Sequence, residues 1–303
     1  VVCVGAMGSG PWDDQSFHQS VQEGMAIAEK ELGILPKFYT VPNDADPNAI
    51  LQKMVDDGMD IIISAGFEYT DAVLVFAREH PGVQVIGIDQ LYAEEAPANL
   101  VGVNYHEDQA GFLAGALAGM MTQTNSVGAV CGLDWIPAVW RYCEGFRAGV
   151  LYVNADAAVD IRYYPGGIDS AFTDPDWGAA MAKEMIVGEK ADVLFSAAGA
   201  TSNGVHQLAL ELNVYAIGVD VDQYYTVSQE VQKVLLSSAA KDITGSVVKL
   251  ITLSMKNNFP SGTWYGEVSL APYHDLEQAV PQGVKDKILI LTEQLASGQI
   301  QTN

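Results

Sequence analysis

Short hydrophobic runs alternate along this chain with longer stretches in which hydrophobic residues recur at helical spacing. The short runs predict strands over residues 1–6, 36–41, 59–65, 83–89, 100–105, 126–132, 159–164, 191–197, 214–220 and 232–238, with one more around Trp264–Ser269. The longer stretches predict helices near residues 16–32, 46–57, 70–80, 106–122, 139–154, 174–188, 202–212 and 241–257, and a final helix from about 282. This alternation is typical of mostly parallel sheets covered by helices on both faces.

One strand–helix–strand pattern occurs twice. Residues 60–66 read DIIISAG and are followed by VIGIDQ at 85–90, while residues 192–199 read DVLFSAAG and are followed by AIGVD at 216–220. The repeat predicts two similar, Rossmann-like α/β lobes with parallel sheets, joined by a hinge. We place the first lobe at residues 1–105 plus about 240–265 and the second at residues 106–239 plus about 266–303. Two facing lobes predict a cleft, which is where a ligand binds.

The chain is acidic because it has few basic residues. Its 303 residues include 38 Asp and Glu against 15 Lys and Arg, which gives a net charge of −23. This balance disfavours nucleic acids, anionic membrane surfaces and polyphosphates as partners. No hydrophobic run approaches the roughly 20 residues of a membrane-spanning helix.

Three cysteines are present, and they leave two interpretations open. Cys3 and Cys131 fall in predicted strands and Cys143 in a predicted helix, so the preferred interpretation is three small buried hydrophobic residues. A disulfide between Cys131 and Cys143 is the alternative, and the odd number leaves at least one free thiol. No Cys or His spacing typical of a metal site occurs, so no metal ligand is predicted.

The loop after the first strand is rich in glycine and acidic residues, since residues 5–17 read GAMGSGPWDDQSF. The glycines can cradle a phosphate at the next helix N-terminus, although Asp13 and Asp14 would repel it. Asp14 or Ser16 can instead simply cap that helix. The third interpretation is a ligand loop, in which the two Asp side chains accept hydrogen bonds and an aromatic ring lies beside them.

Acidic residues also follow the predicted strands, at the edge where ligands bind in open α/β sheets. A turn or helix-capping role is the better interpretation for Asp89, whereas Asp220 and Asp222 are candidate ligand residues. Lys241 is predicted to open a helix, where its charge opposes the helix dipole, so we expect an acidic partner for it. An Asp and Lys pair suits a neutral ligand with several hydroxyl groups, since the carboxylate accepts hydrogen bonds and the ammonium donates them.

Two further groups of residues have both a structural and a ligand-binding interpretation. Glu107 and Asp108 begin a predicted helix at the expected crossing between the lobes, where they either balance the helix dipole or face the cleft. Aromatic residues in loops or early helical turns are either core residues or rings that stack on a flat ligand: Trp12, Phe17, Trp135, Trp140, Phe172 and Trp177. No serine-nucleophile, phosphate-loop or metal motif appears, so no catalytic residue is predicted.

Several motifs, in order along nearly the whole chain, resemble those of the basic membrane lipoprotein family. They are Asp14-x-Ser16-Phe17-x-Gln19-Ser20 with Glu23-Gly24, FLAG at 112–115, Ile136-Pro137 with Gly145-Phe146-x-x-Gly149, AGATSNGV at 198–205, IGVDVDQ at 217–223, and Ser237-x-x-x-Lys241. Characterised members of that family are purine-nucleoside receptors of ABC importers. The resemblance implies a type I periplasmic-binding-protein fold whose two lobes close on a nucleoside, and a periplasmic or lipid-anchored location.

The resemblance also implies which residues bind the ligand. Asp220 would accept hydrogen bonds from the ribose hydroxyls beside Lys241, and Glu107 or Asp108 would approach from the other side. Asp13 or Asp14 would meet the base, and Phe172 would stack on it. With the neighbouring aromatic and motif residues, the predicted ligand-binding set is Trp12, Asp13, Asp14, Phe17, Glu107, Asp108, Phe172, Gly199, Asp220, Asp222 and Lys241.

The chain departs from the family pattern at four positions. His18 stands where the family usually has Asn, and Asp13 stands where Asn is common. Gln22 occupies a position that is often aromatic, so Trp12 or Phe17 is expected to supply the second stacking ring. His206 stands where Phe is frequent, and the ligand can therefore differ from a common purine nucleoside.

The sequence as a whole predicts a monomeric solute-binding protein of an ABC importer, with no enzyme activity and no cofactor. The expected ligand is a nucleoside with a purine base, and the expected protein partners are the permease subunits of the transporter. Three alternatives stay open. They are a receptor of the same fold for a pentose, a furanose signal or a flavin; a nucleoside hydrolase or NAD-dependent enzyme; and the ligand-sensing domain of a signalling protein.

Overall fold

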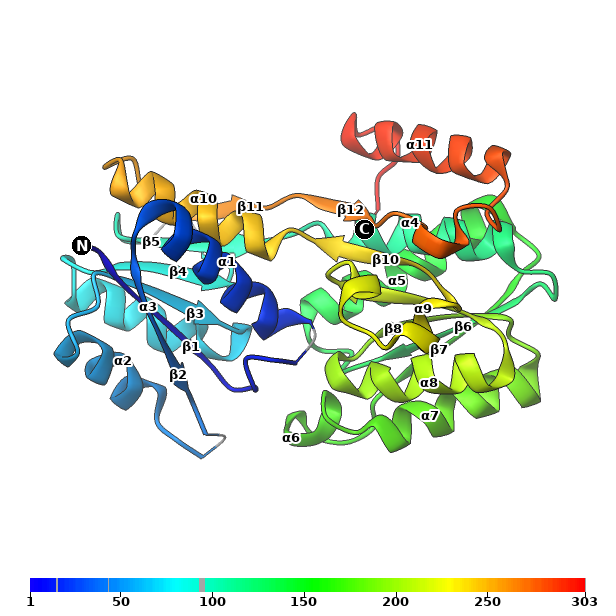
Figure 1. Cartoon of the computed structure of the whole chain (residues 1–303), viewed down its shortest axis with the longest axis horizontal. Coiled ribbons are helices and arrows are strands. Elements are labelled where there is room, and N and C mark those ends of the chain that lie inside the picture. The colour runs from blue at the N-terminus through cyan, green and yellow to red at the C-terminus, as the bar shows by residue number, and fades with distance from the viewer. Residues whose placement is uncertain (15, 43, 93–95, 303) are drawn as a thin grey trace. The chain divides into compact units, whose positions relative to one another are not determined.

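The computed structural model describes residues 1–14, 16–42, 44–92 and 96–302. The chain folds into two compact units (Figure 1). Unit 1 consists of Val1–Tyr105 and Asp242–Glu267, and unit 2 consists of His106–Lys241 and Val268–Asn303. The chain therefore passes between the units after Tyr105, Lys241 and Glu267, where the sequence had placed the passages after residues 105, 239 and 265.

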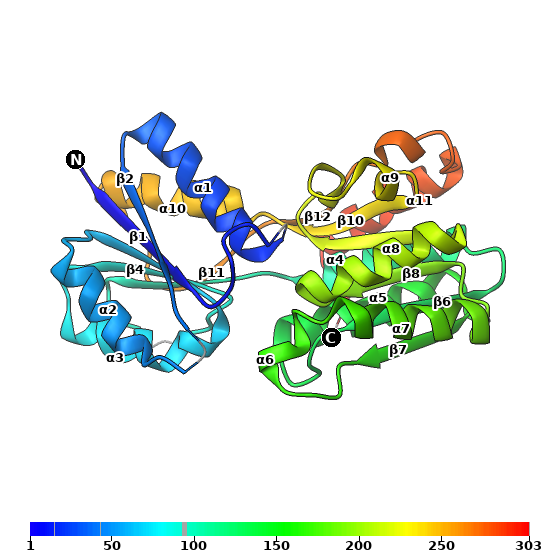
Figure 2. The same cartoon turned by 60° about the horizontal axis from the view of Figure 1, so that its bottom comes forward.

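Unit 1 is built on one parallel sheet. In spatial order its strands are β11 (Gly262–Tyr265), β5 (Leu100–Asn104), β4 (Gln84–Ile88), β3 (Ile61–Ala65), β1 (Cys3–Gly8) and β2 (Leu35–Thr40). Helices α1 (Phe17–Leu32) and α10 (Ile243–Met255) cover one face of the sheet, and α2 (Pro47–Asp56) and α3 (Thr70–Glu79) cover the other (Figure 2). A single 3-10 turn, η1 (Phe67–Tyr69), precedes α3.

Unit 2 has a sheet of the same size. In spatial order its strands are β12 (Val268–Leu270), β10 (Leu235–Lys241), β9 (Tyr215–Asp220), β8 (Val193–Ala197), β6 (Ser126–Cys131) and β7 (Ala158–Tyr163). Its helices are α4 (Glu107–Met121), α5 (Pro137–Val153), α6 (Ile168–Ala171), α7 (Pro175–Lys183), α8 (Ser202–Leu212), α9 (Gln229–Gln232) and α11 (Gln282–Ala296). Shorter turns are η2 (Glu184–Gly188), η3 (Gly199–Thr201), η4 (Gln223–Tyr225) and η5 (His274–Leu276).

The two sheets have the same strand order, which confirms the prediction of two similar α/β lobes. Strands β1 to β5 of unit 1 correspond in position to β6 to β10 of unit 2, and β11 corresponds to β12. The edge strand is the difference, because β11 runs parallel to β5 whereas β12 runs antiparallel to β10. The predicted repeat at 60–66 and 192–199 is thus strands β3 and β8 in equivalent places.

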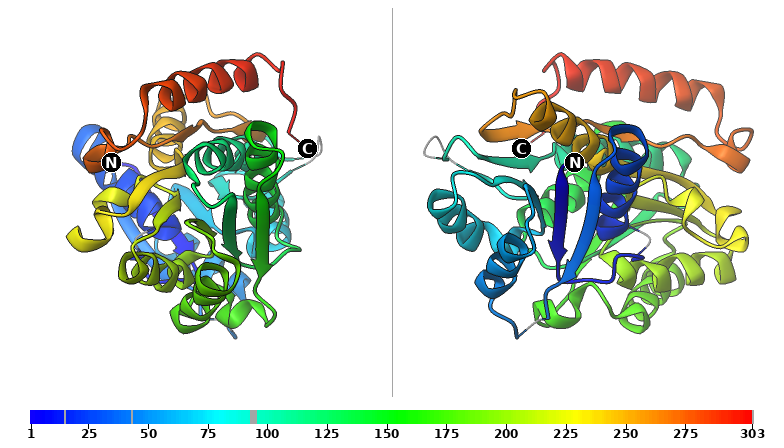
Figure 3. Two further views of the ribbon diagram at one scale, coloured as in Figure 1. Left: turned by 90° about the vertical axis from the view of Figure 1, so that its right-hand side faces the viewer. Right: turned by 60° about the vertical axis from the view of Figure 1, so that its left-hand side comes forward.

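Burial explains the hydrophobic pattern of the central elements. Every residue of β3, β5, β6 and β8 is buried, as expected for strands covered on both faces. Helix α4 is buried almost all round, and α11, the red helix in Figure 3, packs on it. Among the residues described, no helix is both long and apolar enough to cross a membrane.

Two element predictions were wrong. The strand expected around Trp264–Ser269 is two short strands, β11 and β12, that belong to different sheets. The strand expected over 232–238 begins at Leu235 and runs to Lys241, because residues Gln229–Gln232 form helix α9 first. Its extension is held by pairing with β12, a contact between distant segments that local pattern does not contain.

Candidate functional site

Lys241 ends strand β10, and this corrects the prediction that it opens a helix. It is paired with Val268 of β12. Helix α10 begins only at Ile243, because the Asp242 side chain caps it by accepting the backbone N–H of Gly245 at 2.8 Å. The Lys241 side chain is therefore fixed at the carboxyl end of the unit 2 sheet, where it is 2% exposed.

Lys241 lies between two carboxylates. Its Nζ is 3.7 Å from Oδ1 of Asp220 and 3.8 Å from Oε1 of Glu107. The same ammonium lies 5.9 Å from the ring centroid of Tyr142. Since an isolated buried charge is strongly unfavourable, the two acids supply the negative charge that a buried lysine requires.

Glu107 contacts a second cation, Arg141, whereas the neighbouring Asp108 has other partners. Nε of Arg141 lies 2.7 Å from Oε2 of Glu107, so this fully buried carboxylate joins a guanidinium and an ammonium. Asp108 accepts a hydrogen bond from the Thr302 hydroxyl, and its Oδ1 lies 3.9 Å from Nδ1 of His106. Of the two acids at the start of α4, Glu107 is thus the one that lies with Lys241. We call Glu107, Arg141, Asp220 and Lys241 the charged cluster.

A tight turn fixes the backbone of Asp220. Its φ is 66°, in the left-handed region that non-glycine residues rarely adopt. Oε1 of Gln223 accepts the N–H of Val219 at 3.0 Å, and the N–H of Gln223 donates to Oγ of Ser238 at 3.1 Å. A Cβ on Gly218 would lie 2.2 Å from Oε1 of Gln223, so the turn requires a glycine there.

A turn with a left-handed Asp also occurs in unit 1, at Asp89. This residue also has a left-handed φ, of 59°. The side chain of Gln90 closes the turn by donating to the carbonyl of Gly66 at 2.6 Å, and a Cβ on Gly87 would lie 2.1 Å from its Oε1. In both units the Gly-hydrophobic-Asp pattern thus ends a strand with an Asp in the left-handed region, and in unit 2 Lys241 lies beside that Asp.

Asp222 has structural partners of its own. It caps η4 by accepting the N–H of Tyr224 at 3.3 Å, and its Oδ2 lies 2.7 Å from Nε2 of His274. These contacts tie the turn after β9 to the segment after β12. The role of Asp222 in ligand binding stays a prediction.

Phe172 lies over strand ends that carry no large side chains. A Cβ on Gly132 would fall 2.6 Å from Cε1 of the Phe172 ring, and a Cβ on Gly199 would fall 3.1 Å from its Cβ. The N–H of Gly132 donates to the carbonyl of Ala197 at 3.0 Å, so β6 and β8 end side by side in small residues. The half-buried ring thus packs closely on the backbone at these two glycines.

The carboxyl edge of the unit 2 sheet has two chemically different parts. Strands β10, β9, β8 and β6 follow one another in the sheet. Lys241 and Asp220 end the first two, while Gly199 and Gly132 follow the other two. Because neighbouring strands are roughly 4.8 Å apart, the small-residue part under Phe172 begins about one strand spacing from Asp220. A charged part and an apolar, aromatic part are therefore adjacent on one edge.

Helices α4 and α5 are in backbone contact. A Cβ on Gly115 would lie 1.9 Å from the backbone oxygen of Phe146, and a Cβ on Gly149 would lie 1.9 Å from that of Phe112. Each glycine is necessary because any side chain would force the helices apart. This contact fixes the two helices whose early turns carry the acid and the arginine of the charged cluster.

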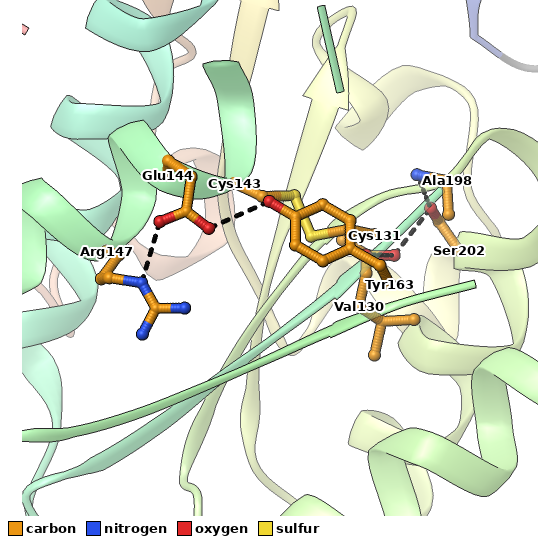
Figure 4. Close-up of a disulfide and its surroundings, with 9 residues drawn as sticks. Val130, Cys131, Cys143, Glu144, Arg147, Tyr163, Ala198 and Ser202 are labelled. Carbon is orange, nitrogen blue, oxygen red and sulfur yellow. Dashed lines mark hydrogen bonds and ion pairs between the residues drawn. A yellow bond between two sulfur atoms is a disulfide. The ribbon is translucent and has the colours of Figure 1, made fainter. Parts of the chain in front are cut away.

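A disulfide joins Cys131 at the end of β6 to Cys143 in α5 (Figure 4). The preferred prediction of three unbonded cysteines was therefore wrong, although both residues lie in the elements predicted for them. Helix α5 packs so that the two Cα atoms lie 6.6 Å apart, within the range that a disulfide spans. Cys3 is the free cysteine and is half-buried.

In unit 1, Asp14 caps helix α1. Its carboxylate accepts the backbone N–H groups of Ser16 at 3.0 Å, His18 at 3.0 Å and Gln19 at 3.1 Å. Burial raises the pKa of Asp14, but hydrogen bonds from the side chain and backbone of His18 and from Gln19 outweigh it and lower the pKa below its usual 3.8. The Ser16 side chain makes no capping bond, and Gln15 lies outside the described residues.

His18 completes this arrangement. Its Nδ1 lies 2.9 Å from Oδ2 of Asp14, and its Nε2 accepts the N–H of Gly10 at 3.3 Å. A ring that accepts at Nε2 carries its proton on Nδ1 and donates it to the carboxylate. The histidine that departs from the family pattern thus holds the glycine loop against the helix start.

The predicted aromatic residues of this loop surround His18. Trp12 meets its ring edge-on at a centroid distance of 5.7 Å and packs against Phe38 at 5.0 Å, and Phe17 meets it edge-on at 5.3 Å. Among the described residues, the buried Nε1 of Trp12 has no hydrogen-bond partner. Asp13 is exposed, so its carboxylate is accessible to solvent. Their contacts with a ligand stay predictions.

Sequence reasoning did not single out Arg141 or Tyr142. The available signal was the scarcity of basic residues, which number only 15, combined with the position of Arg141 early in the helix after β6. Within the part of the chain that the structure describes, no group of three or more His, Cys, Asp or Glu side chains is placed to hold a metal ion.

Residues 1–266 match the family model described as ABC transporter substrate-binding protein PnrA-like. "Basic membrane protein A" from Borreliella burgdorferi is 29% identical over 85% of this chain and 72% of its own length. "ABC transporter nucleoside-binding protein BmpA" from Lactococcus lactis is 28% identical over 83% of this chain and 74% of its own length.

A solved structure of a solute-binding protein of an ABC transporter system from Aeropyrum pernix has the same fold. Its TM-score is 0.82 at 21% identity, and the match covers 100% of this chain and 94% of that chain. The two-lobed, parallel α/β architecture is thus that of type I periplasmic solute-binding proteins. The chain belongs to the PnrA-like family of ABC transporter substrate-binding proteins.

Proposed function

We propose that this chain is the nucleoside receptor of an ABC importer and that it prefers a purine base. The observation that carries the proposal is the position of Lys241 between Asp220 and Glu107, on the same sheet edge as Phe172. A nucleoside has two chemically different halves, and this edge offers one part suited to each.

The charged part of the edge suits a sugar with neighbouring hydroxyl groups. The Asp220 carboxylate accepts hydrogen bonds, and the Lys241 ammonium donates them, so adjacent hydroxyls can be bound together. The Asp220 side chain is 13% exposed whereas that of Glu107 is 1% exposed. Asp220 is therefore the acid we expect to contact the ribose.

The other part of the edge suits a flat ring. The Phe172 side chain packs closely on Gly132 and Gly199, and its half-buried ring offers an aromatic face on which a planar group can stack. A purine has more stacking area than a pyrimidine, which favours the larger base. The name of the Lactococcus lactis relative, a nucleoside-binding protein, supports the same ligand class.

Charge favours a nucleoside over a nucleotide. The net charge of −23 disfavours the approach of a phosphate ester, and each cation of the charged cluster already lies beside a carboxylate. We propose binding without turnover, at the outer side of the cytoplasmic membrane, followed by delivery to the permease subunits. No catalytic role is assigned to any residue.

A thermal-shift panel on ligand-stripped protein tests the proposal. The panel comprises purine and pyrimidine nucleosides, free bases, nucleotides, pentoses, riboflavin and NAD. A ligand at about 100 times its Kd adds roughly 2.7 kcal/mol of stability, which raises the Tm by several degrees. We expect the largest rise with purine nucleosides. A rise only with a pentose, riboflavin or NAD would contradict the proposal, as would release of free base from a bound nucleoside.

A further inference from the structure

We propose that Arg141 is a positioning residue of the binding site: it holds the Glu107 carboxylate so that the Lys241 ammonium stays shared with Asp220. This inference rests on the proposed function, since Asp220 is the acid expected to contact the ribose. No sequence motif contains Arg141, but its side chain contacts the buried Glu107.

The distances show how the charges are divided. Arg141 contacts Glu107 directly, with Nε 2.7 Å from Oε2. Lys241 is farther from both acids, at 3.8 Å from Glu107 and 3.7 Å from Asp220. The guanidinium thus provides the short, charge-assisted hydrogen bond to Glu107, and the ammonium is left nearly equidistant between the two carboxylates.

Because Glu107 is buried, the position of the Lys241 ammonium between Glu107 and Asp220 should depend on the charge of Arg141. The Glu107 side chain is 1% exposed, and a carboxylate so far from water needs a cation close by. If Arg141 lost its charge, the ammonium of Lys241 would be drawn toward Glu107. The cation would then lie farther from Asp220, the acid expected to contact the ribose.

The surrounding structure fixes the helix that carries Arg141. Helix α5 cannot slide along α4, because Gly145 and Gly149 place it in backbone contact with Asp108 and Phe112. Two residues after Arg141, Cys143 is bonded to Cys131 at the end of β6. The backbone contacts with α4 and the disulfide together fix helix α5, so the guanidinium that it carries is preorganised for the Glu107 carboxylate.

The test compares three variants by isothermal titration with the purine nucleoside that the unaltered protein binds best. Arg141→Met keeps much of the side-chain volume without the charge and should weaken binding by about ten-fold or more. Arg141→Lys keeps the positive charge beside Glu107 and should restore most of the affinity. Arg147→Met is the matched control, since Arg147 lies on the same helix and pairs at 3.0 Å with Glu144, outside the charged cluster (Figure 4).

The outcomes separate the two proposals. Failure of the unaltered protein to bind any nucleoside would overturn the proposed function and this inference with it. Nucleoside binding with equal affinities for Arg141→Met and Arg147→Met would overturn the inference alone. If Arg141→Met does not fold by circular dichroism, Arg141→Gln, which keeps a donor without the charge, takes its place with the same expected loss. Affinity lost equally in Arg141→Met and Arg141→Lys would show that a positive charge at this position is not sufficient, and would refute positioning by charge.

Discussion

Lys241 and Asp220 end neighbouring strands, and their Nζ and Oδ1 atoms lie 3.7 Å apart. The register explains the contact, because Asp220 is paired with Ala240 of β10 and Lys241 is the next residue. A strand-to-strand register is set by the whole sheet, so the pair is fixed before any ligand binds. The Asp220 carboxylate and the Lys241 ammonium are therefore already placed together at the carboxyl edge of the sheet in the ligand-free protein.

Replacing Asp220 should separate binding from folding. Asp220→Asn removes the charge and keeps the shape and the left-handed turn, which Asn tolerates well. We expect nucleoside affinity to fall by about 30-fold or more, because a charged hydrogen-bond partner is lost. The ligand-free protein should still fold, with a lower Tm because the buried Lys241 ammonium loses a neighbouring carboxylate. Isothermal titration and thermal unfolding measure the two effects. Asp286→Asn on α11, an exposed acid that accepts a hydrogen bond from Gln282, is the control and should bind as the unaltered protein does.

Reduction of the disulfide should lower the stability of the protein. The bond closes a loop with a sequence separation of 12, for which chain entropy predicts a contribution of about 3 kcal/mol to the free energy of unfolding. Urea unfolding of the Cys131→Ala/Cys143→Ala variant measures this loss. Cys3→Ala, at the free cysteine, should cost clearly less, and equal losses would contradict a stabilising role for the bond.

His206 should make the protein less stable in weak acid. It is fully buried on α8, neither ring nitrogen has a hydrogen-bond partner among the described residues, and burial lowers its pKa from 6.5 to about 4. Between these values the unfolded chain binds a proton that the folded chain does not. The stability from this group is therefore complete above pH 6.5 and decreases as the pH falls toward 4, by about 3 kcal/mol.

Urea unfolding at several pH values tests this dependence. His206→Phe, which cannot be protonated, should flatten the decrease between pH 6.5 and 4. The same substitution at His106, whose side chain is 49% exposed, should leave the decrease in place because His206 is still present. An unchanged slope in His206→Phe would show that other groups cause it.

Replacing Asp13 or Asp14 should change the stability of the protein by different amounts, although the sequence analysis gave both residues the same candidate role. Asp14→Ala removes the acceptor of three backbone N–H groups at the start of α1 and should cost about 1–2 kcal/mol of stability. Asp13 is exposed, so Asp13→Ala should change stability by less than about 0.5 kcal/mol. Chemical unfolding of the two variants measures the difference, and equal losses would contradict the capping role.

Local pattern was sufficient for most of the fold. The strands and helices of both lobes were predicted because the hydrophobic runs and helical spacing are themselves the cause of burial, as in β3 and β8. The end of strand β10, in contrast, is set by a tertiary contact. Lys241 was misplaced because its strand is extended by pairing with β12, a contact between residues that local pattern does not connect.

The candidate site could be predicted only in part, for the same physical reason. Asp220 was selected from its position at a strand end and Lys241 from its expected acidic partner and the family motif, but the choice between Glu107 and Asp108 depends on the direction of each side chain. Adjacent helix positions point about 100° apart, and only tertiary packing decides which one meets Lys241. Arg141 and the bond between Cys131 and Cys143 both depend on how α5 packs, and that is set by glycines on α4 as much as by α5 itself.

The most direct test of the account is a side-by-side titration of the unaltered, ligand-stripped protein with a purine ribonucleoside and its 2′,3′-dideoxy counterpart. The two ligands share the base and differ only in the hydroxyl groups that Asp220 and Lys241 are proposed to bind. We predict saturable binding of one ribonucleoside per chain and a loss of about 100-fold or more for the dideoxy compound, whose absence of hydroxyls leaves the charged groups unpaired. No binding of the ribonucleoside, or equal binding of the two compounds, would contradict the account.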